Sequence, residues 1–299
     1  MSPDASDSEA SVSETSDPQN EPTMRTFSIG SIRILLVATS LLVAGRAPAQ
    51  PLVAGDRPVW PGGARMALSL SFDDGRGSQV TEGLAVFARH GAKVTLYVVP
   101  SAIEPRLDGW KRAVAAGHEI GNHSLTHSCS GNFPFSRQKA LEEHSLVRMR
   151  GELVEANRRI ATLLGVTPRT FAYPCGQTFV GRGRATQSYV PIVAELFLAG
   201  RGWLDEAAND PAFVDLAQTL GVEMDGKDFA QIRPLLDEAR TRGAWLVLAG
   251  HEIGASGNQT TRIAMLDELL AYTKDPANGI WLGTVSEAAD WIKSRYRPR

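Results

Sequence analysis

The chain has 299 residues, of which 43% are hydrophobic and 21% are charged, a composition typical of a globular protein with one large core or two small ones. Its formal net charge of −2 argues against a nucleic-acid-binding protein that relies on a broad basic surface. Residues 1–23 carry six acids and no Lys or Arg, and residues 25–49 carry three arginines and no acid. The remainder is close to neutral, so charge does not indicate the substrate.

The first part of the chain has the pattern of a targeting segment. Residues 1–23 are acidic and poor in apolar side chains, which predicts a disordered extension or a translation start placed too early. Residues 24–49 combine a basic start, an apolar run at 34–44 and the small-residue pattern Ala47-Pro48-Ala49, as in a secretory signal peptide. We therefore expect an exported protein of the periplasm, the cell envelope or the extracellular space.

A membrane anchor is the alternative interpretation of the apolar run. The run is shorter than the roughly 20 residues of a spanning helix, so the signal peptide is favoured and no stable membrane span is expected after cleavage. The remaining residues, 50–299, are predicted to form one domain. They contain two cysteines, Cys129 and Cys175. Export permits a disulfide between them, and two buried thiols are the alternative.

Strand-like and helix-like segments alternate along residues 50–299. In chain order we predict strand 65–72, helix 79–89, strand 93–99, helix 109–116, strand 119–122, helix 136–164, strand 170–173, helices 190–198 and 232–240, strand 244–249, helix 263–272, strand 280–282 and helix 286–296. Ser136 is the predicted N-cap of the longest helix. Apolar strands separated by helices predict a parallel sheet covered on both faces, as in a (β/α) barrel. An open doubly wound sheet is the alternative, although Gly75-Arg76-Gly77 lacks the third glycine of a dinucleotide-binding turn.

Polar side chains follow the predicted strands directly, at the ends where active sites form in parallel α/β proteins. Adjacent residues leaving a strand point in different directions, so one of Asp73 and Asp74 could bind a metal while the other faces a substrate. Taken alone, this pair is better explained as an ordinary Asp-Asp-Gly turn. His123 and His127 have the spacing of a metal-binding pair and, with one carboxylate, would leave coordination positions open.

Two further segments are candidates for the same face. His251 follows an apolar strand and could donate a proton, or it could be a histidine that caps backbone groups. Residues 171–176 end in a tight turn that could present a backbone N–H to an oxyanion, or it could be a plain strand-ending turn. A His-Glu-x-x-His zinc site is excluded, because His123 comes one residue too late after His118-Glu119. His118 is therefore interpreted as structural.

Together, these segments resemble the polysaccharide deacetylases with the NodB homology domain, carbohydrate esterase family four. Residues 71–75 (SFDDG) match the first motif of the family, and residues 117–127 (GHEIGNHSLTH) match the second over eleven positions. His251 after a Leu-Val-Leu strand matches the fifth motif. The motifs occur in family order across nearly all of residues 65–285. The resemblance implies an α/β fold, a distorted and incomplete (β/α) barrel with about seven strand–helix units, and makes residues 50–299 the catalytic domain.

The resemblance also implies a role for each matched residue. Asp73 would be the general base and His251 the general acid, and the backbone N–H of Cys175 would support the oxyanion. The residues that would bind a divalent metal are Asp74, His123 and His127. The metal would most often be Zn²⁺, with Co²⁺ or Ni²⁺ as alternatives. The substrate would be an acetylated glycan that contains N-acetylglucosamine, and the reaction would be N-deacetylation or, with the same residues, cleavage of O-acetyl esters.

This chain departs from the family pattern in two places. The third motif usually reads Arg-Pro-Pro-Tyr-Gly, but residues 172–176 read AYPCG, so the arginine that would orient the base is missing. Arg184 or Arg201 could replace it. The fourth motif has no clear match, and residues 201–205 (RGWLD) are the best candidate.

One structural hypothesis and two functions other than glycan deacetylation remain open. We hypothesise that Cys129 and Cys175 form a disulfide that ties the His127 loop to the turn at Cys175. A hydrolase of a small cyclic amide or imide is a second enzymatic interpretation. A non-catalytic glycan-binding protein on the same fold is the third, kept open by the missing arginine and opposed by the retained Asp73 and His251.

Overall fold

The structure, a computed structural model, describes residues 58–295. The acidic extension predicted at 1–23 and the signal peptide predicted at 24–49 lie outside these residues. Within residues 58–295, no helix combines the length and the apolar character needed to cross a membrane.

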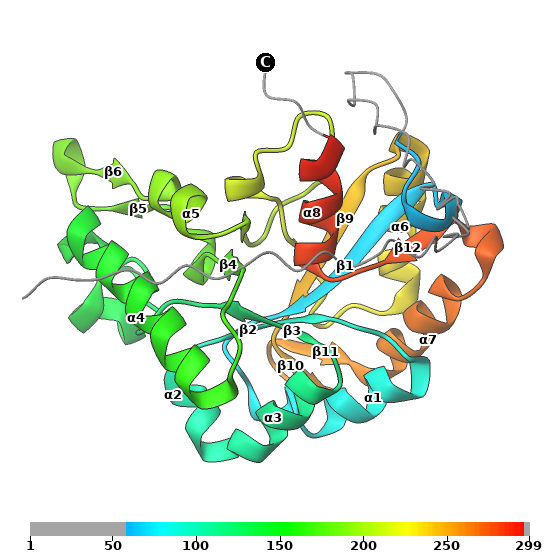
Figure 1. Ribbon diagram of the computed structural model, residues 1–299, viewed down its shortest axis with the longest axis horizontal. Coiled ribbons are helices and arrows are strands. Elements are labelled where there is room, and N and C mark those ends of the chain that lie inside the picture. Colours follow the sequence, from blue (N-terminus) through cyan, green and yellow to red (C-terminus); the bar gives the residue numbers. More distant parts are fainter. Residues whose placement is uncertain (1–57, 296–299) are drawn as a thin grey trace, which may run out of the picture. The chain divides into compact units, whose positions relative to one another are not determined.

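Strands and helices alternate through most of the described chain (Figure 1). The strands are β1 Met66–Phe72, β2 Thr95–Val98, β3 Glu119–Asn122, β4 Thr170–Ala172, β5 Phe179–Val180, β6 Gln187–Ser188, β7 Ala199–Arg201, β8 Val222–Glu223, β9 Trp245–Gly250, β10 Glu252–Gly254, β11 Thr260–Arg262 and β12 Ile280–Leu282. The helices are α1 Glu82–His90, α2 Pro100–Ile103, α3 Leu107–Ala115, α4 Leu146–Leu164, α5 Val190–Leu196, α6 Phe229–Arg242, α7 Ile263–Thr273 and α8 Val285–Arg295.

The main sheet is parallel and curls into a distorted barrel. Its strands run in the order β7-β4-β3-β2-β1-β9-β8, and β12 pairs with the first half of β1. The two ends of this order are joined through Thr219, which lies just before β8. Its backbone N–H donates to Gly200 O at 2.7 Å, and its carbonyl accepts from Gly202 N at 2.7 Å. The predicted barrel class is therefore confirmed, with closure by a single bridge in place of a full strand pair.

The two faces of β1 show why this strand positions a polar site. Leu68, Leu70 and Phe72 are fully buried in the outer core, which α1, α3, α6 and α7 cover (Figure 1). The intervening residues, Ser69 and Ser71, are also fully buried and point to the other side of the sheet, toward the barrel interior. Asp73 continues this alternation at the end of the strand, so its carboxylate enters the end of the barrel where the strands terminate.

The opposite end of the barrel is filled with apolar side chains. Helix α8 contacts both β1 and β7 there. It contributes Val285 and Ile292 to a cluster that includes Trp60 and Trp245. This packing closes the amino-terminal ends of the strands, so the open end of the barrel is the one where the strands terminate.

The helix predicted at 136–164 is correct only in its second part. Helix α4 begins at Leu146 with Ser145 as its N-cap, and Ser145 accepts a hydrogen bond from the Arg148 N–H at 3.2 Å. Ser136 lies in a 3₁₀ turn and is not a cap. Its hydroxyl instead bonds both backbone groups of Cys129, at 2.8 and 2.7 Å, which shapes the loop after β3.

Candidate functional site

The predicted site residues converge where the barrel strands end. A cavity of about 600 Å³ opens there. It is lined by Asp73, Asp74, Arg76, Val99, Ser101, Ala102, His123, His127, Phe133, Phe135, Cys175, Trp203, Leu204, His251 and Gln259. All six residues predicted for the site therefore face one cavity, although they come from four different strand ends.

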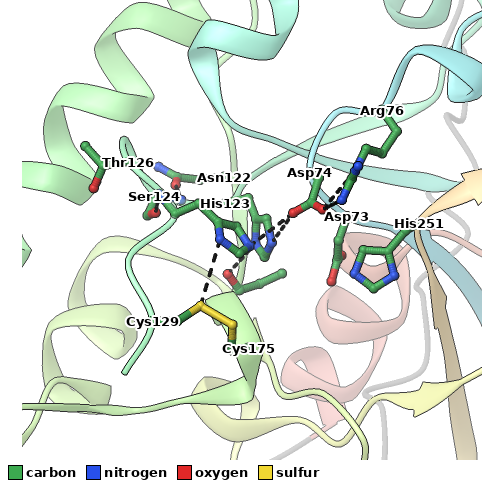
Figure 2. A network of polar contacts seen from close by, with 12 residues as sticks. Asp73, Asp74, Arg76, Asn122, His123, Ser124, Thr126, Cys129, Cys175 and His251 are labelled. Carbon is green, nitrogen blue, oxygen red and sulfur yellow. Dashed lines mark hydrogen bonds and ion pairs between the residues drawn. A yellow bond between two sulfur atoms is a disulfide. The ribbon is translucent and has the colours of Figure 1, made fainter. Parts of the chain in front are cut away.

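Asp74 and the two histidines form a cluster suited to a metal ion. Asp74 and Gly75 both have positive φ, 70° and 67°, so the turn interpretation of Asp-Asp-Gly is also correct. This turn directs Asp74 away from Asp73 and toward the loop after β3. Asp74 Oδ1 lies 3.4 Å from His123 Nε2 (Figure 2). The same oxygen lies 3.1 Å from His127 Nε2.

The donor set of this cluster fits a divalent cation. The three potential ligand atoms lie within 4.8 Å of one another. Asp74 Oδ1 is buried and has no hydrogen-bond partner among the described residues, which is costly for a carboxylate oxygen unless a cation compensates it. Two imidazoles and one carboxylate are a known ligand set for Zn²⁺ and related metals. Burial lowers the pKa of His127, which favours the neutral ring that a ligand requires.

Backbone contacts set the orientation of the two histidines. His123 Nδ1 lies 2.9 Å from the carbonyl oxygen of Ala172, an arrangement that leaves Nε2 facing Asp74. His127 lies in a loop with a φ of 52°, and its backbone N–H donates to Ser124 Oγ at 2.9 Å. The four-residue spacing of the pair is thus realised in a loop after β3 and not on a helix.

Asp73 is paired with a buried arginine. Arg201 Nη2 donates to Asp73 Oδ1, and the side chains are 0% and 4% exposed. Burial would raise the pKa of Asp73, but Arg201, followed by His123 and His251, outweighs burial and lowers that pKa below its ordinary value. Arg184 and Arg201 are the candidates to replace the missing third-motif arginine. Arg201 is the one that pairs with Asp73, and Arg184 is exposed at the surface. Arg201 enters from β7, a strand that sequence patterns did not reveal.

His251 is supported by a carboxylate that the sequence analysis missed. His251 Nδ1 lies 2.7 Å from Asp225 Oδ2, and Asp225 Oδ1 accepts hydrogen bonds from the His251 N–H and the Thr261 hydroxyl. Burial acts to lower the pKa of His251, but the Asp225 hydrogen bond and the charges of Asp73 and Asp74 raise it overall. Asp225 follows the two-residue strand β8, and its only sequence signal is an Asp-Gly turn after a short apolar stretch.

The turn at Cys175 is tied to the loop that carries His127. Cys129 and Cys175 form a disulfide with a Cα–Cα distance of 6.0 Å, as hypothesised. Cys129 Sγ lies 3.9 Å from His127 Nδ1. The backbone of Cys175 has a φ of 55° and the residue lines the cavity. The disulfide thus joins the segment of a potential metal ligand to the segment of a potential oxyanion donor.

Apolar side chains form the rim of the cavity. Trp203 stands edge-on to His251, with ring centroids 4.8 Å apart, so this residue of the candidate fourth motif lies beside His251. Phe133 and Phe135 are exposed on the opposite loop, with ring centroids 5.5 Å apart. A polar floor with an apolar rim is the usual composition of a small-molecule or oligomer-binding cleft.

Comparison with known proteins finds a family match over part of the chain. Residues 63–188 match the family model described as polysaccharide deacetylase. A peptidoglycan-N-acetylglucosamine deacetylase from Bacillus cereus is 32% identical over 115 residues, which cover 38% of this chain and 38% of the relative. A chitooligosaccharide deacetylase from Sinorhizobium fredii is 38% identical over 84 residues, which cover 27% of this chain and 39% of the relative. The chain thus matches less than half the length of these relatives.

The fold also occurs in a solved structure of another description. The crystal structure of the Puue allantoinase aligns with a TM-score of 0.57 and 18% identity, covering 81% of this chain and 95% of that chain. This likeness supports the barrel fold alone, because a fold by itself does not determine a reaction.

Proposed function

We propose that this chain, whose residues 63–188 match the polysaccharide deacetylase family model, is a metal-dependent hydrolase that removes N-acetyl groups from a carbohydrate and releases acetate. It would act on carbon–nitrogen bonds other than peptide bonds, with O-acetyl esters as possible further substrates. The observation that carries the proposal is the convergence of three ligand atoms, the Asp73–Arg201 pair and the His251–Asp225 pair on one cavity.

The proposed metal ligands are Asp74, His123 and His127, and Zn²⁺ is the favoured ion, with Co²⁺ or Ni²⁺ as alternatives. A bound divalent ion would lower the pKa of a water molecule and polarise the acetyl carbonyl. Three protein ligands leave positions for that water and the substrate, as in catalytic zinc sites.

The proposed roles of Asp73 and His251 follow from their partners. Asp73 accepts the proton of the attacking water while Arg201 holds its other oxygen in place. The water oxygen bonds to the acetyl carbon, and the carbon–nitrogen bond breaks as His251 donates a proton to the departing amine. Asp225 stabilises the protonated imidazole before that transfer. The backbone N–H of Cys175 is the proposed donor to the carbonyl oxygen as negative charge develops there.

The proposed substrate is an acetylated glycan that contains N-acetylglucosamine. The matched relatives are named for peptidoglycan and chitooligosaccharide substrates, and the aromatic rim at Phe133, Phe135 and Trp203 offers apolar faces to a sugar ring. We also propose that the protein is exported. The predicted signal peptide and the disulfide support this, because disulfides persist in oxidising compartments.

Acetate release is the test of this proposal. Purified protein would be given chitooligosaccharides, peptidoglycan, acetylated xylan, an aryl acetate and a cyclic amide, as purified, after chelation and after Zn²⁺ or Co²⁺ is restored. We expect release that chelation abolishes and metal restores. Asp73→Asn should lower the rate by at least about 100-fold, the lower range for loss of general base catalysis. Asp290→Asn, which alters a surface pair with Arg169, is the matched control and should keep full activity.

The other outcomes select the alternative functions. Turnover of the cyclic amide alone would indicate the small-amide hydrolase. Tight metal binding without turnover of any substrate would indicate the glycan-binding protein, for which neither Asp73 nor His251 is required.

A further inference from the structure

Arg76 contacts the potential metal ligand Asp74 from the side opposite the histidines. Its Nε and Nη2 atoms donate to Asp74 Oδ2 at 2.9 and 2.8 Å. The other carboxylate oxygen, Oδ1, faces His123 and His127. Figure 2 shows Asp74 between Arg76 and His123. The two oxygens of the Asp74 carboxylate therefore have different partners: Oδ2 accepts from Arg76, and Oδ1 faces the histidines.

Arg76 is itself held by the loop that follows the proposed acid. Arg76 Nη1 lies 3.7 Å from Glu252 Oε1, and Glu252 is the residue after His251. Glu252 Oε2 accepts from the Ser78 hydroxyl, whose oxygen accepts from the Ile253 N–H at 2.9 Å. The guanidinium group is thus fixed at both ends although its side chain is 40% exposed.

We propose that Arg76 is a positioning residue for the metal centre, an inference that rests on the metal site of the proposed function. By occupying Oδ2, Arg76 makes Asp74 a ligand through Oδ1 alone. A carboxylate that bound through both oxygens would fill a coordination position needed for water or substrate. Residues that hydrogen-bond to the ligands of a metal, without binding the metal themselves, commonly set the metal affinity of a site in this way.

A simple charge effect predicts the opposite result. A cation next to the ligand set repels a divalent ion, so removal of Arg76 would then tighten metal binding. If Arg76 instead acts by orienting Asp74, removal of Arg76 would weaken metal binding. Lysine separates the two effects, because it keeps the charge but cannot make the paired donation of a guanidinium group.

The test is the Zn²⁺ affinity of the full chain, measured by competition with a chromogenic chelator. We expect Arg76→Ala to weaken Zn²⁺ binding about 10- to 100-fold, the range for loss of such supporting contacts, and Arg76→Lys to restore little of it. Arg89→Ala is the matched control, because Arg89 Nη2 donates to both carboxylate oxygens of Asp267 at the surface and its loss should leave the affinity unchanged. Unchanged or tighter binding in Arg76→Ala would overturn the inference.

Further readouts separate this inference from the proposed function. In the presence of a chelator, Arg76→Ala should melt at the temperature of the parent protein, and a large loss there would indicate a merely structural role and overturn the inference. Should that variant fail to fold, Arg76→Lys carries the same test. If the parent protein binds none of Zn²⁺, Co²⁺ and Ni²⁺, both the inference and the proposed function fail. If the parent binds Zn²⁺ and deacetylates while both Arg76 variants match it, this inference alone fails.

Discussion

Arg201 is a buried cation whose charge is matched by one carboxylate. Its side chain is 0% exposed, and it lies over the ring of Tyr97, 5.2 Å from the centroid, inside the barrel. Removing one member of a buried pair leaves the other charge uncompensated, which typically costs about 3–5 kcal/mol. Arg201 therefore supports both the fold and the orientation of Asp73.

We expect Arg201→Met to lower the free energy of unfolding by about 3–5 kcal/mol and to reduce the proposed deacetylation strongly. Urea denaturation checks the first effect and acetate release the second. Arg169→Met is the control, because Arg169 and Asp290 form an exposed pair worth less than about 1 kcal/mol. Equal losses in the two variants would contradict the importance of the buried pair.

The pH profile depends on the partner of His251. A general acid must be protonated, so in the proposed role of His251 activity would fall as pH rises through the pKa of this residue. Asp225, together with Asp73 and Asp74, raises the pKa of His251 and so keeps the acid form present to higher pH. Asp225→Asn removes one of these charges, so the alkaline fall in kcat should move to lower pH.

The measurement is kcat against pH for the parent protein and Asp225→Asn. Asp267→Asn is the control, since Asp267 pairs with His90 at the surface and has no contact with the site. An alkaline limb that stays in place in Asp225→Asn would show that Asp225 does not set the protonation of His251.

At the scale of elements, long regular segments were predictable and short ones were not. β1 and β9 were recognisable because their apolar runs are continuous, and the catalytic candidates Asp73 and His251 followed from their place after those runs. β7 and β8 have three and two residues, too few to show a period, so Arg201 was only one of two candidates and Asp225 was missed. The start of α4 was misplaced because Ser136 resembles a cap in sequence, while its hydroxyl bonds Cys129 in the fold.

The disulfide links the loop after β3 to the turn after β4, two segments that follow neighbouring strands of the sheet. Cys129 and Cys175 are 46 residues apart, and closing a loop of that length accounts for about 4 kcal/mol in the chain-entropy model. The link also holds the loop of His127, together with a hydrogen bond of 2.7 Å from the Ser130 N–H to Gln177 Oε1. Its loss should affect both the stability of the fold and the proposed metal site.

We expect the double variant Cys129→Ser, Cys175→Ser to lose about 2–4 kcal/mol of unfolding free energy and to bind Zn²⁺ more weakly. Urea denaturation of metal-free protein, with and without reductant, measures the first effect. Reductant should destabilise the parent protein and leave the double variant unchanged. A parent protein that is insensitive to reductant while its disulfide is shown to be cleaved would contradict this expectation.

At the scale of the whole molecule, the site couples distant parts of the chain. The potential ligands come from the turn after β1 and the loop after β3, and the proposed base and acid are held by residues of β7 and of the turn after β8. Each of these segments reaches the cavity only when the sheet has curled and closed through Thr219. The unfolded chain therefore cannot assemble the same ligand set, and metal binding should be linked to the global stability of the barrel.

This linkage gives a prediction for the metal-loaded protein. At a free Zn²⁺ concentration 100 times Kd, binding to the native state alone adds about 2.7 kcal/mol, equivalent to a rise in Tm of about 5–10 °C for a domain of this size. Scanning calorimetry in a metal buffer should show this rise, and it should be absent in Asp74→Asn, His123→Ala and His127→Ala. Arg89→Ala, altered only at the surface, should show the full rise. An equal rise in Asp74→Asn would mean that Zn²⁺ binds elsewhere, because this variant loses the one anionic ligand of the cluster.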